Sequence, residues 1–235
     1  MHKIIFLHGL SLSRTIWNRL TPNITNYECI TPDLIGHGDN NKERIFDFKT
    51  MWSDVLPSFS DYSENILVLH SMASALLPEI ALSGLKIKKI VLIEANLIEQ
   101  DSKWSKDLSS MNSKDFNRTV QRIKDNPVMF LKMQLSNDLP HVELKKLSEG
   151  YLKFNSIALK EIAKNLFIRT TNGEIQKAIS NLSSQIIYLR GGNSPDWNEG
   201  RRFLKNKEIQ YIEIPNSKHY PMIDNPHDSL RAILN

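Results

Sequence analysis

Residues 65–76, which read NILVLHSMASAL, constrain the fold more than any other stretch of the chain. The aliphatic run 66–69 is typical of a strand buried on both faces of a parallel sheet. Small residues follow, and then apolar residues at helical spacing, so a helix is expected to begin almost at once. Ser71 therefore stands at a tight turn from strand to helix, which is the geometry of a nucleophile elbow. We expect its hydroxyl at the carboxyl edge of the sheet.

The pattern of apolar runs extends this prediction to the whole chain. Strand-like runs at 4–7, 28–31, 66–69 and 89–93 alternate with helical patterns at 16–20, 48–59 and 72–83, which is the rhythm of a parallel sheet. Between 97 and 182 we find helical periods and no convincing strand, with breaks near 125–127 and 138–140. Strand patterns return at 185–189 and 209–214. The sequence predicts an α/β fold with about six mostly parallel strands flanked by helices. Residues 1–96 and 185–235 would form the core, and residues 97–184 a helical cap.

Length and composition agree with one globular enzyme-sized domain. The 235 residues can bury a sizeable core, and 40% hydrophobic with 24% charged residues is ordinary for such a domain. No run reaches the roughly 18 apolar residues of a membrane span, so we expect no membrane partner. The net charge of +4 is spread out, and the lysines at 86–89 have no interleaved aromatic residues, which argues against nucleic-acid binding.

Two further observations concern compartment and cofactors. Cys29 is the only cysteine, and the first residues lead straight into a strand without the apolar core of a signal peptide. Both facts favour a cytoplasmic location. The histidines and acidic residues show no metal-ligand spacing, so no metal or cofactor is expected. The sequence does not indicate the oligomeric state.

Three candidate functional segments follow predicted strands. They are Ser71 at the elbow, His219 after the last strand, and the His8-Gly9-Leu10 turn after the first strand. Alone, each has an ordinary explanation: a helix cap, a loop histidine and a turn. In a parallel sheet, however, the carboxyl ends of all strands lie at one edge, where ligands bind. The three segments are therefore expected to meet.

At this point the chain resembles the α/β-hydrolase-fold enzymes along almost its whole length. His8-Gly9 resembles the oxyanion loop of that family, residues 33–38 (DLIGHG) its Gly-His-Gly turn, and His70-Ser71-Met72 its nucleophile elbow. His219 stands where the family has its catalytic histidine. The elbow departs from Gly-x-Ser-x-Gly, since Leu69 and Ala73 replace the two glycines. Ala73 meets the need for a small residue and Leu69 does not.

The resemblance leaves the third member of the triad to be decided among three carboxylates. Many relatives carry it in the loop after the penultimate strand, but Ser194 replaces the expected Asp there, and Asp196 lies two residues further on. Haloalkane dehalogenases and some small esterases instead place it at the end of the strand after the elbow helix, where this chain has Glu94. A buried, unpaired charge at this position would be unfavourable, and a contact with His219 would provide the missing partner. We prefer Glu94, then Asp196, with Asp101 a distant third.

The resemblance implies a serine hydrolase that cleaves a small or medium ester or thioester through Ser71, His219 and Glu94. Backbone N–H groups of Leu10 and Met72 would hold the oxyanion, and His8, Gly9, His70 and Trp104 would contact the substrate. A lyase or C–C hydrolase on the same triad, or a ligand-binding protein with vestigial catalysis, are the alternatives. Seven apolar cap residues are candidates to line the pocket, although residues at helical spacing more often serve ordinary packing: Trp104, Met111, Phe116, Met129, Phe130, Met133 and Phe154.

Overall fold

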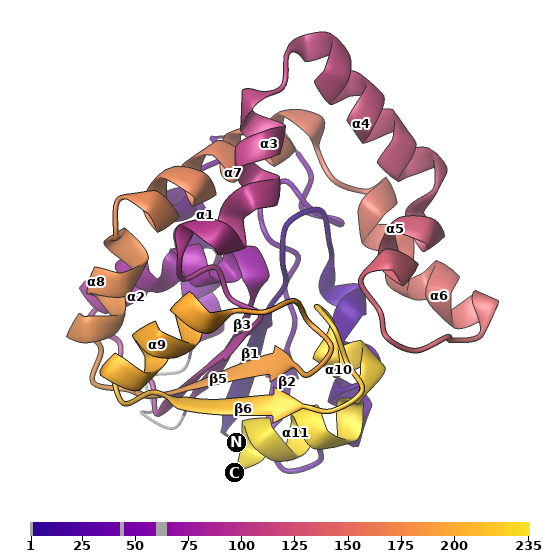
Figure 1. The fold of residues 1–235 in the computed structure, drawn as a ribbon. Coiled ribbons are helices and arrows are strands. Elements are labelled where there is room, and N and C mark those ends of the chain that lie inside the picture. The colour runs from indigo at the N-terminus through magenta and orange to yellow at the C-terminus, as the bar shows by residue number, and fades with distance from the viewer. Residues whose placement is uncertain (1, 43–44, 60–64) are drawn as a thin grey trace.

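A computed structural model describes residues 2–42, 45–59 and 65–235. Within these residues six strands form one all-parallel sheet in the order β2-β1-β3-β4-β5-β6 (Figure 1). The predicted class, a parallel sheet of about six strands with a helical insertion, is confirmed. The strands are β1 (Lys3–Leu7), β2 (Glu28–Ile30), β3 (Ile66–His70), β4 (Lys89–Ile93), β5 (Gln185–Gly191) and β6 (Gln210–Ile214).

The central strands are buried on both faces, as their continuous apolar runs predict. Successive side chains of a strand point to opposite faces, so Ile5 and Leu7 belong to one hydrophobic cluster and Ile4 and Phe6 to the other. Helices α1 (Phe48–Val55), α2 (Leu77–Leu82) and α9 (Asn198–Asn206) cover the first face. The 3-10 turn η1 (Arg14–Trp17) and helices α10 (Pro221–Asp224) and α11 (Pro226–Leu234) cover the second.

Three predicted core helices are shorter or tighter than expected. In place of the helix predicted at 16–20, the structure has η1 and a second 3-10 turn, η2 (Thr21–Asn23), which has a proline in its first turn. Pro22 has no N–H to donate, so an α-helix cannot continue through it. The elbow helix begins as the 3-10 segment η4 (Ser71–Leu76) and becomes α2 only at Leu77. Pro78 cannot donate to the Ser74 carbonyl, and the N–H of Leu77 bonds it instead. The expected helix 48–59 is α1 followed by η3 (Leu56–Ser58).

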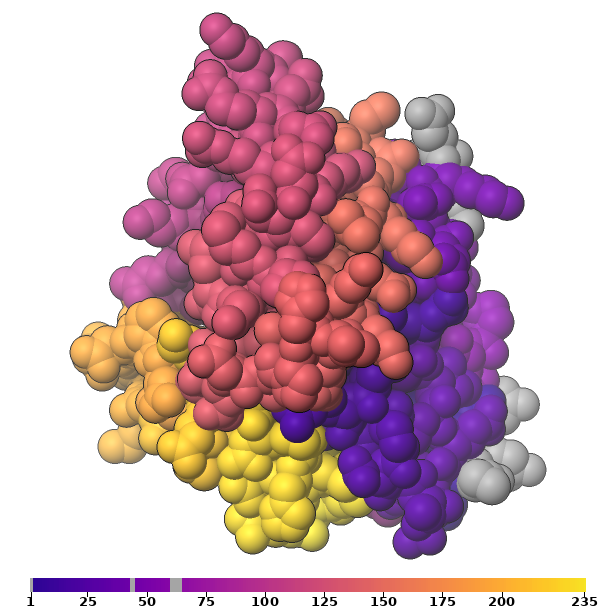
Figure 2. Space-filling model, turned by 90° about the vertical axis from the view of Figure 1, so that its right-hand side faces the viewer, coloured from indigo at the N-terminus to yellow at the C-terminus, as the bar shows by residue number. Residues whose placement is uncertain are grey.

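Every element within residues 97–184 is a helix, and two of the breaks between helices lie where the sequence indicated them, at 126 and at 134–140. Further breaks lie at 111–112, 153–155 and 172–173. Figure 2 shows this insertion above the C-terminal segment. None of the helices that the structure describes is long and apolar enough to cross a membrane. The insertion contains η5 (Glu99–Ser102), α3 (Lys103–Ser110), α4 (Ser113–Asp125), α5 (Pro127–Met133), α6 (His141–Leu147), η6 (Ser148–Leu152), α7 (Ser156–Thr171) and α8 (Glu174–Asn181).

The end of the insertion packs directly on the sheet layers. Ala158 and Ile162 of α7 and Ile175 of α8 belong to the same buried cluster as β1 and β3. Arg169 of α7 forms a two-point ion pair with Glu79 of α2, at 2.6 and 2.7 Å, and the guanidinium also donates to the Ala75 carbonyl. Helices α7 and α8 are therefore anchored to the elbow helix. The division into a core and a cap at residues 97 and 184 stays a prediction.

Candidate active site

Ser71 lies at the strand-to-helix turn with a left-handed backbone. Its φ is +51°, a conformation that non-glycine residues rarely adopt, so the turn is strained in the way an elbow requires. The first-strand loop approaches this turn closely. A Cβ at Gly9 would lie 2.8 Å from His70 Nδ1 and 3.1 Å from Ser71 Cβ. A glycine is needed at position 9 because any side chain would collide with the elbow.

A cavity of about 330 Å³ opens between the sheet edge and the insertion. Ser71 and His219 both line it, from loops that the sequence predicted to meet. Of the seven candidate lining residues of the insertion, Trp104, Phe130 and Met133 border the cavity, and the other four do not. The remaining lining residues are Leu10, Ser11, Leu12, His70, Asn96, Asp101, Ser105, Ile123, Gln134, Tyr151, Leu166 and Tyr220.

The Ser71 hydroxyl is turned toward Asn96 in this structure. It donates to Asn96 Oδ1 at 3.4 Å, and within the described part of the chain it makes no hydrogen bond to His219. Asn96 is itself fixed, because its backbone N–H donates to Ser74 Oγ at 3.0 Å and its side-chain amide donates to the Asp101 carbonyl at 2.5 Å. A rotation about the Cα–Cβ bond of Ser71 is needed to face the imidazole. Such loose contacts are common in unliganded active sites.

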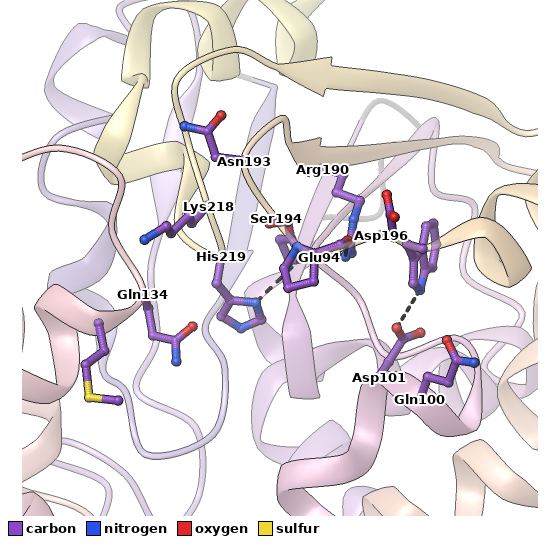
Figure 3. A pocket seen from close by; sticks show the side chains of 13 residues that line it. Glu94, Gln100, Asp101, Gln134, Arg190, Asn193, Ser194, Asp196, Lys218 and His219 are labelled. Atoms are coloured by element: carbon purple, nitrogen blue, oxygen red, sulfur yellow. Dashed lines mark hydrogen bonds and ion pairs between the residues drawn. The ribbon is translucent and has the colours of Figure 1, made fainter.

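Glu94 is a buried carboxylate at the tip of β4, and only 6% of it is exposed. Its Oε1 accepts from the Gly191 N–H at 2.8 Å and from the Ser194 hydroxyl at 2.6 Å. Its Oε2 accepts from Arg190 at 3.0 Å and lies 3.7 Å from His219 Nδ1. Figure 3 shows the imidazole directed at this carboxylate. The loop in which many relatives carry the acid thus supplies donors that hold Glu94.

The electrostatics keep Glu94 ionised. Burial by itself raises the pKa of the carboxyl. The hydrogen bond and charge of His219, the charge of Arg190 and the hydrogen bond from Ser194 lower it by more, so the pKa of Glu94 is lowered. Arg190 is in turn held by the Pro195 carbonyl at 2.9 Å and by the Trp197 ring, 4.8 Å from its centroid. A fixed cation therefore stands behind the carboxylate that faces His219.

The two alternative carboxylates are engaged differently. Asp196 is exposed, and Figure 3 shows its carboxylate pointing away from His219. Asp101 accepts from the backbone N–H groups of Leu97 and Ile98 at 2.8 and 2.9 Å and from the Trp197 indole at 2.6 Å. Burial raises its pKa to about 6. Of the three carboxylates considered, Glu94 is the one that contacts His219.

His8 and His70 hold the loops of the site together. The fully buried His8 ring accepts the Leu34 N–H at 3.0 Å and bonds the Gly9 carbonyl at 2.9 Å, so it does not border the cavity. His70 lines the cavity, and its Nε2 lies 3.0 Å from the carbonyl of His219. Because a carbonyl only accepts, Nε2 of His70 carries the proton. His70 thereby fixes the loop that carries His219.

The residues expected to hold the oxyanion border the nucleophile. Leu10 lines the cavity, in a turn closed by the Leu12 N–H to Gly9 carbonyl bond of 3.4 Å. Met72 directly follows Ser71 in the first turn of η4 and is buried. Trp104, which belongs to helix α3 of the insertion, also lines the cavity and is 45% exposed. The region described contains no group of three or more His, Cys, Asp or Glu side chains arranged to hold a metal.

A second, more polar cavity of about 410 Å³ lies beside the first (Figure 3). The two share Asp101, Met133, Gln134 and His219, so His219 stands between them. Glu94, Arg190 and Ser194 border only the second cavity. The imidazole therefore borders the cavity of Ser71 on one side and the cavity of its carboxylate partner on the other.

Comparison with known proteins identifies the family. The profile of the Alpha/beta hydrolase family matches residues 4–232, so the chain belongs to this family. A haloalkane dehalogenase of Mesorhizobium japonicum is 33% identical over 78 residues, which are 31% of this chain and 25% of the relative's length.

Solved structures share the fold at low sequence identity. An esterase from Exiguobacterium antarcticum superposes with a TM-score of 0.79 at 13% identity, covering 100% of this chain and 91% of its own. An epoxide hydrolase superposes with a TM-score of 0.77 at 18% identity, covering 100% and 90%. The fold thus hosts several hydrolytic chemistries, and the substrate class depends on the site.

Sequence reasoning missed Arg190 and Asn96. Arg190 is the last residue but one of β5 and follows the buried run 187–189, and Asn96 comes two residues after Glu94. A charged residue at the tip of a buried strand is the signal that indicated Glu94, and applied to β5 it would also have selected Arg190. Asn96 carries no comparable signal, because its role depends on where the Ser71 side chain points.

Proposed function

We propose that the protein is a serine hydrolase that cleaves a small or medium carboxylic ester or thioester. Ser71 is the nucleophile, His219 the general base and Glu94 the acid that orients the imidazole. The observation that carries the proposal is the environment of Glu94. A buried carboxylate with four partners, one of them an imidazole that shares a cavity with an elbow serine, fits a charge-relay triad better than a purely structural ion pair.

In the proposed reaction His219 takes the Ser71 proton as the Ser71 oxygen attacks the carbonyl carbon. Backbone N–H groups of Leu10 and Met72 stabilise the negative charge on the carbonyl oxygen. The intermediate collapses, and the alcohol or thiol leaves with the proton from His219. A water molecule, deprotonated by His219, then releases the acid and restores Ser71.

The substrate class follows from the nucleophile and from the cavity. A serine forms an acyl-enzyme with a carbonyl, whereas haloalkane dehalogenation on this fold uses an aspartate at this position, so we place this chain with the ester hydrolases. The cavity of about 330 Å³ is bordered by Leu12, Ile123 and Phe130. This volume and this lining suit a substrate with a short or medium apolar group.

The decisive experiment is labelling with a fluorophosphonate probe followed by peptide mass mapping. We expect label on Ser71 in the wild type and none in Ser71→Ala. Ser11→Ala is the matched control, because Ser11 lines the same cavity and, among the described residues, its hydroxyl bonds the Leu10 carbonyl alone. Folded protein without label on Ser71 would contradict the proposal. Labelling without turnover of any p-nitrophenyl ester or acyl thioester would leave the triad standing and refute the ester assignment.

A further inference from the structure

Two tyrosines meet where the insertion touches the core. Tyr151 lies in η6 and Tyr220 directly follows His219, and their hydroxyl oxygens are 2.8 Å apart. The two side chains line the cavity that contains Ser71, although only 6% and 4% of these residues is exposed. The two tyrosines therefore belong to the wall of the candidate active site.

The two hydroxyls have one proton more than their mutual hydrogen bond uses. Each phenol carries one O–H, and the bond between them consumes one of the two protons. Across the residues that the structure describes, neither hydroxyl has another hydrogen-bond partner. A buried donor without an acceptor is unfavourable. The second proton is thus left without an acceptor among the described residues.

Both hydroxyls remain protonated at neutral pH. Burial raises the pKa of Tyr151 to about 12 and that of Tyr220 well above its ordinary value. The pair consequently acts as a neutral hydrogen-bond donor and not as a phenolate. Leu12 and Phe130 border the same cavity, so an apolar wall surrounds part of this polar spot.

Packing holds the pair at this place. The Tyr220 ring lies 5.2 Å from the His219 ring and 5.4 Å from the His70 ring, centroid to centroid. On the other side, η6 is pressed against the first-strand loop. A Cβ at Gly150 would lie 2.6 Å from the backbone of Leu12 and Ser13. These contacts place Tyr220 against the two histidines and η6 against the first-strand loop.

We propose that the Tyr151–Tyr220 hydroxyl pair is a substrate subsite that donates one hydrogen bond to a second oxygen atom of the substrate. The enzyme then prefers esters that carry a carbonyl, ether or hydroxyl oxygen, in addition to the scissile group, over esters with a plain hydrocarbon chain. The inference rests on the proposed function, because it places this oxygen in a substrate held at Ser71. It assigns to the cavity a substrate class, which the fold alone does not determine.

The test compares matched esters that differ only in one oxygen. One arm sets p-nitrophenyl 4-oxopentanoate against p-nitrophenyl pentanoate, and the other sets the 2-methoxyethyl ester of pentanoic acid against its butyl ester. In at least one arm we expect the oxygenated ester to have the higher kcat/KM, by roughly 3- to 10-fold, which is the effect of one neutral hydrogen bond. Equal kcat/KM in both arms would overturn the proposal.

Phenylalanine variants separate donation to the substrate from a merely structural latch. Tyr151→Phe and Tyr220→Phe each leave one hydroxyl that keeps its own proton, so at least one of them should retain the preference. The double variant should lose it. A latch predicts instead that each single change has the full effect and that the double adds nothing. Tyr211→Phe is the control, since the Tyr211 hydroxyl bonds Glu213 outside the cavity.

The outcomes distinguish this inference from the proposed function. Turnover of pentanoate esters without any oxygen preference would retain the hydrolase and refute the subsite. Absence of turnover with every ester would refute the hydrolase assignment. In that case the Kd values of the two p-nitrophenyl esters, measured by calorimetry on Ser71→Ala and on its Tyr151→Phe/Tyr220→Phe derivative, decide the subsite. A Kd ratio near one on Ser71→Ala would overturn it.

Discussion

At the scale of single residues, the site depends on charges that are buried and fully engaged. Glu94 has a positive φ of +45° at the tip of β4, a strained backbone that carries its carboxylate to four partners from other segments. An isolated carboxylate would be unfavourable at this depth, and Arg190 and Ser194 remove that penalty. Glu94 therefore presents an oriented, ionised carboxylate to Nδ1 of His219.

Replacing Glu94 by Gln tests this arrangement directly. The amide keeps the size of the side chain but cannot stabilise a protonated His219, so we expect kcat/KM for a p-nitrophenyl ester to fall roughly 10²- to 10⁴-fold. Asp196→Asn is the matched control and should change kcat/KM by less than about twofold, since Asp196 is exposed and faces away from His219. Steady-state kinetics with thermal unfolding of each variant gives the measurement. Loss of turnover in Asp196→Asn alone would reverse the assignment.

At the scale of elements, η6 connects the insertion to the loop that is expected to hold the oxyanion. Gly150 packs on the backbone of Leu12 and Ser13, and the next residue, Tyr151, enters the cavity wall. Helix α7 is fixed independently by the ion pair between Arg169 and Glu79. The insertion is therefore attached to the core at two separate places, and residues of η6 shape the site.

Gly150→Ala should disturb activity through this contact. A methyl group 2.6 Å from backbone atoms must push η6 or the loop 10–13 away. We expect a stability loss of about 1–3 kcal/mol, as for other overpacked sites, and a fall in kcat/KM of roughly tenfold or more because Leu10 moves.

Gly84→Ala is the control for the Gly150 variant. Gly84 has a φ of +68° and no atom within 4 Å of an added Cβ, so it should lose stability through backbone strain and keep its kcat/KM. Urea unfolding and ester kinetics measure both quantities. Unchanged kcat/KM in Gly150→Ala would show that η6 does not position the loop.

At the scale of the whole molecule, buried histidines link stability to pH. Burial lowers the pKa of His8 from 6.5 to about 4 and that of His37 from 6.5 to about 3, and it also lowers the pKa of His70. The unfolded chain therefore binds more protons than the folded chain below pH 6.5. Stability is fully present above that pH and is lost as the pH falls toward 4. Burial raises the pKa of Asp101 from 3.8 to about 6, so at this residue the folded chain binds the extra proton. Its effect on stability is opposite to that of the three histidines.

We accordingly expect the free energy of unfolding to fall between pH 6.5 and 4, by roughly 1.4 kcal/mol per pH unit for each net proton. Urea unfolding across this range measures the slope. His8→Gln, which retains a donor and an acceptor, should reduce the slope by about one proton. His227→Gln is the control, because 85% of the His227 side chain is exposed and it meets solvent in both states. A slope that is flat or rises toward acid would contradict this account.

The parts that could be predicted from the sequence are those set by local patterns. Continuous aliphatic runs require strands buried on both faces, and their alternation with helices requires parallel pairing, so the sheet and its carboxyl edge followed directly. Positions in loops after strands, such as Ser71 and His219, could be placed at that edge for the same reason. The segments around 16–20 and 72–76 were predicted as α-helix, and the structure has the 3-10 segments η1, η2 and η4 there. Pro22 and Pro78, just beyond 16–20 and 72–76, each lack the N–H that an α-helical bond would need.

Contacts between distant segments were decided only by the tertiary structure. The sequence left three carboxylates as candidate partners of His219, with Glu94 preferred. In the structure Glu94 contacts His219 and is held by Arg190, Gly191 and Ser194, and Gly191 lies 97 positions further along the chain. The pairing of Tyr151 with Tyr220 spans 69 residues and leaves no trace in local periodicity. The sequence by itself determined the layers and the edge where chemistry can occur, because side-chain burial repeats along the chain. The tertiary structure decided which side chains meet at that edge, because such meetings depend on loop paths and packing.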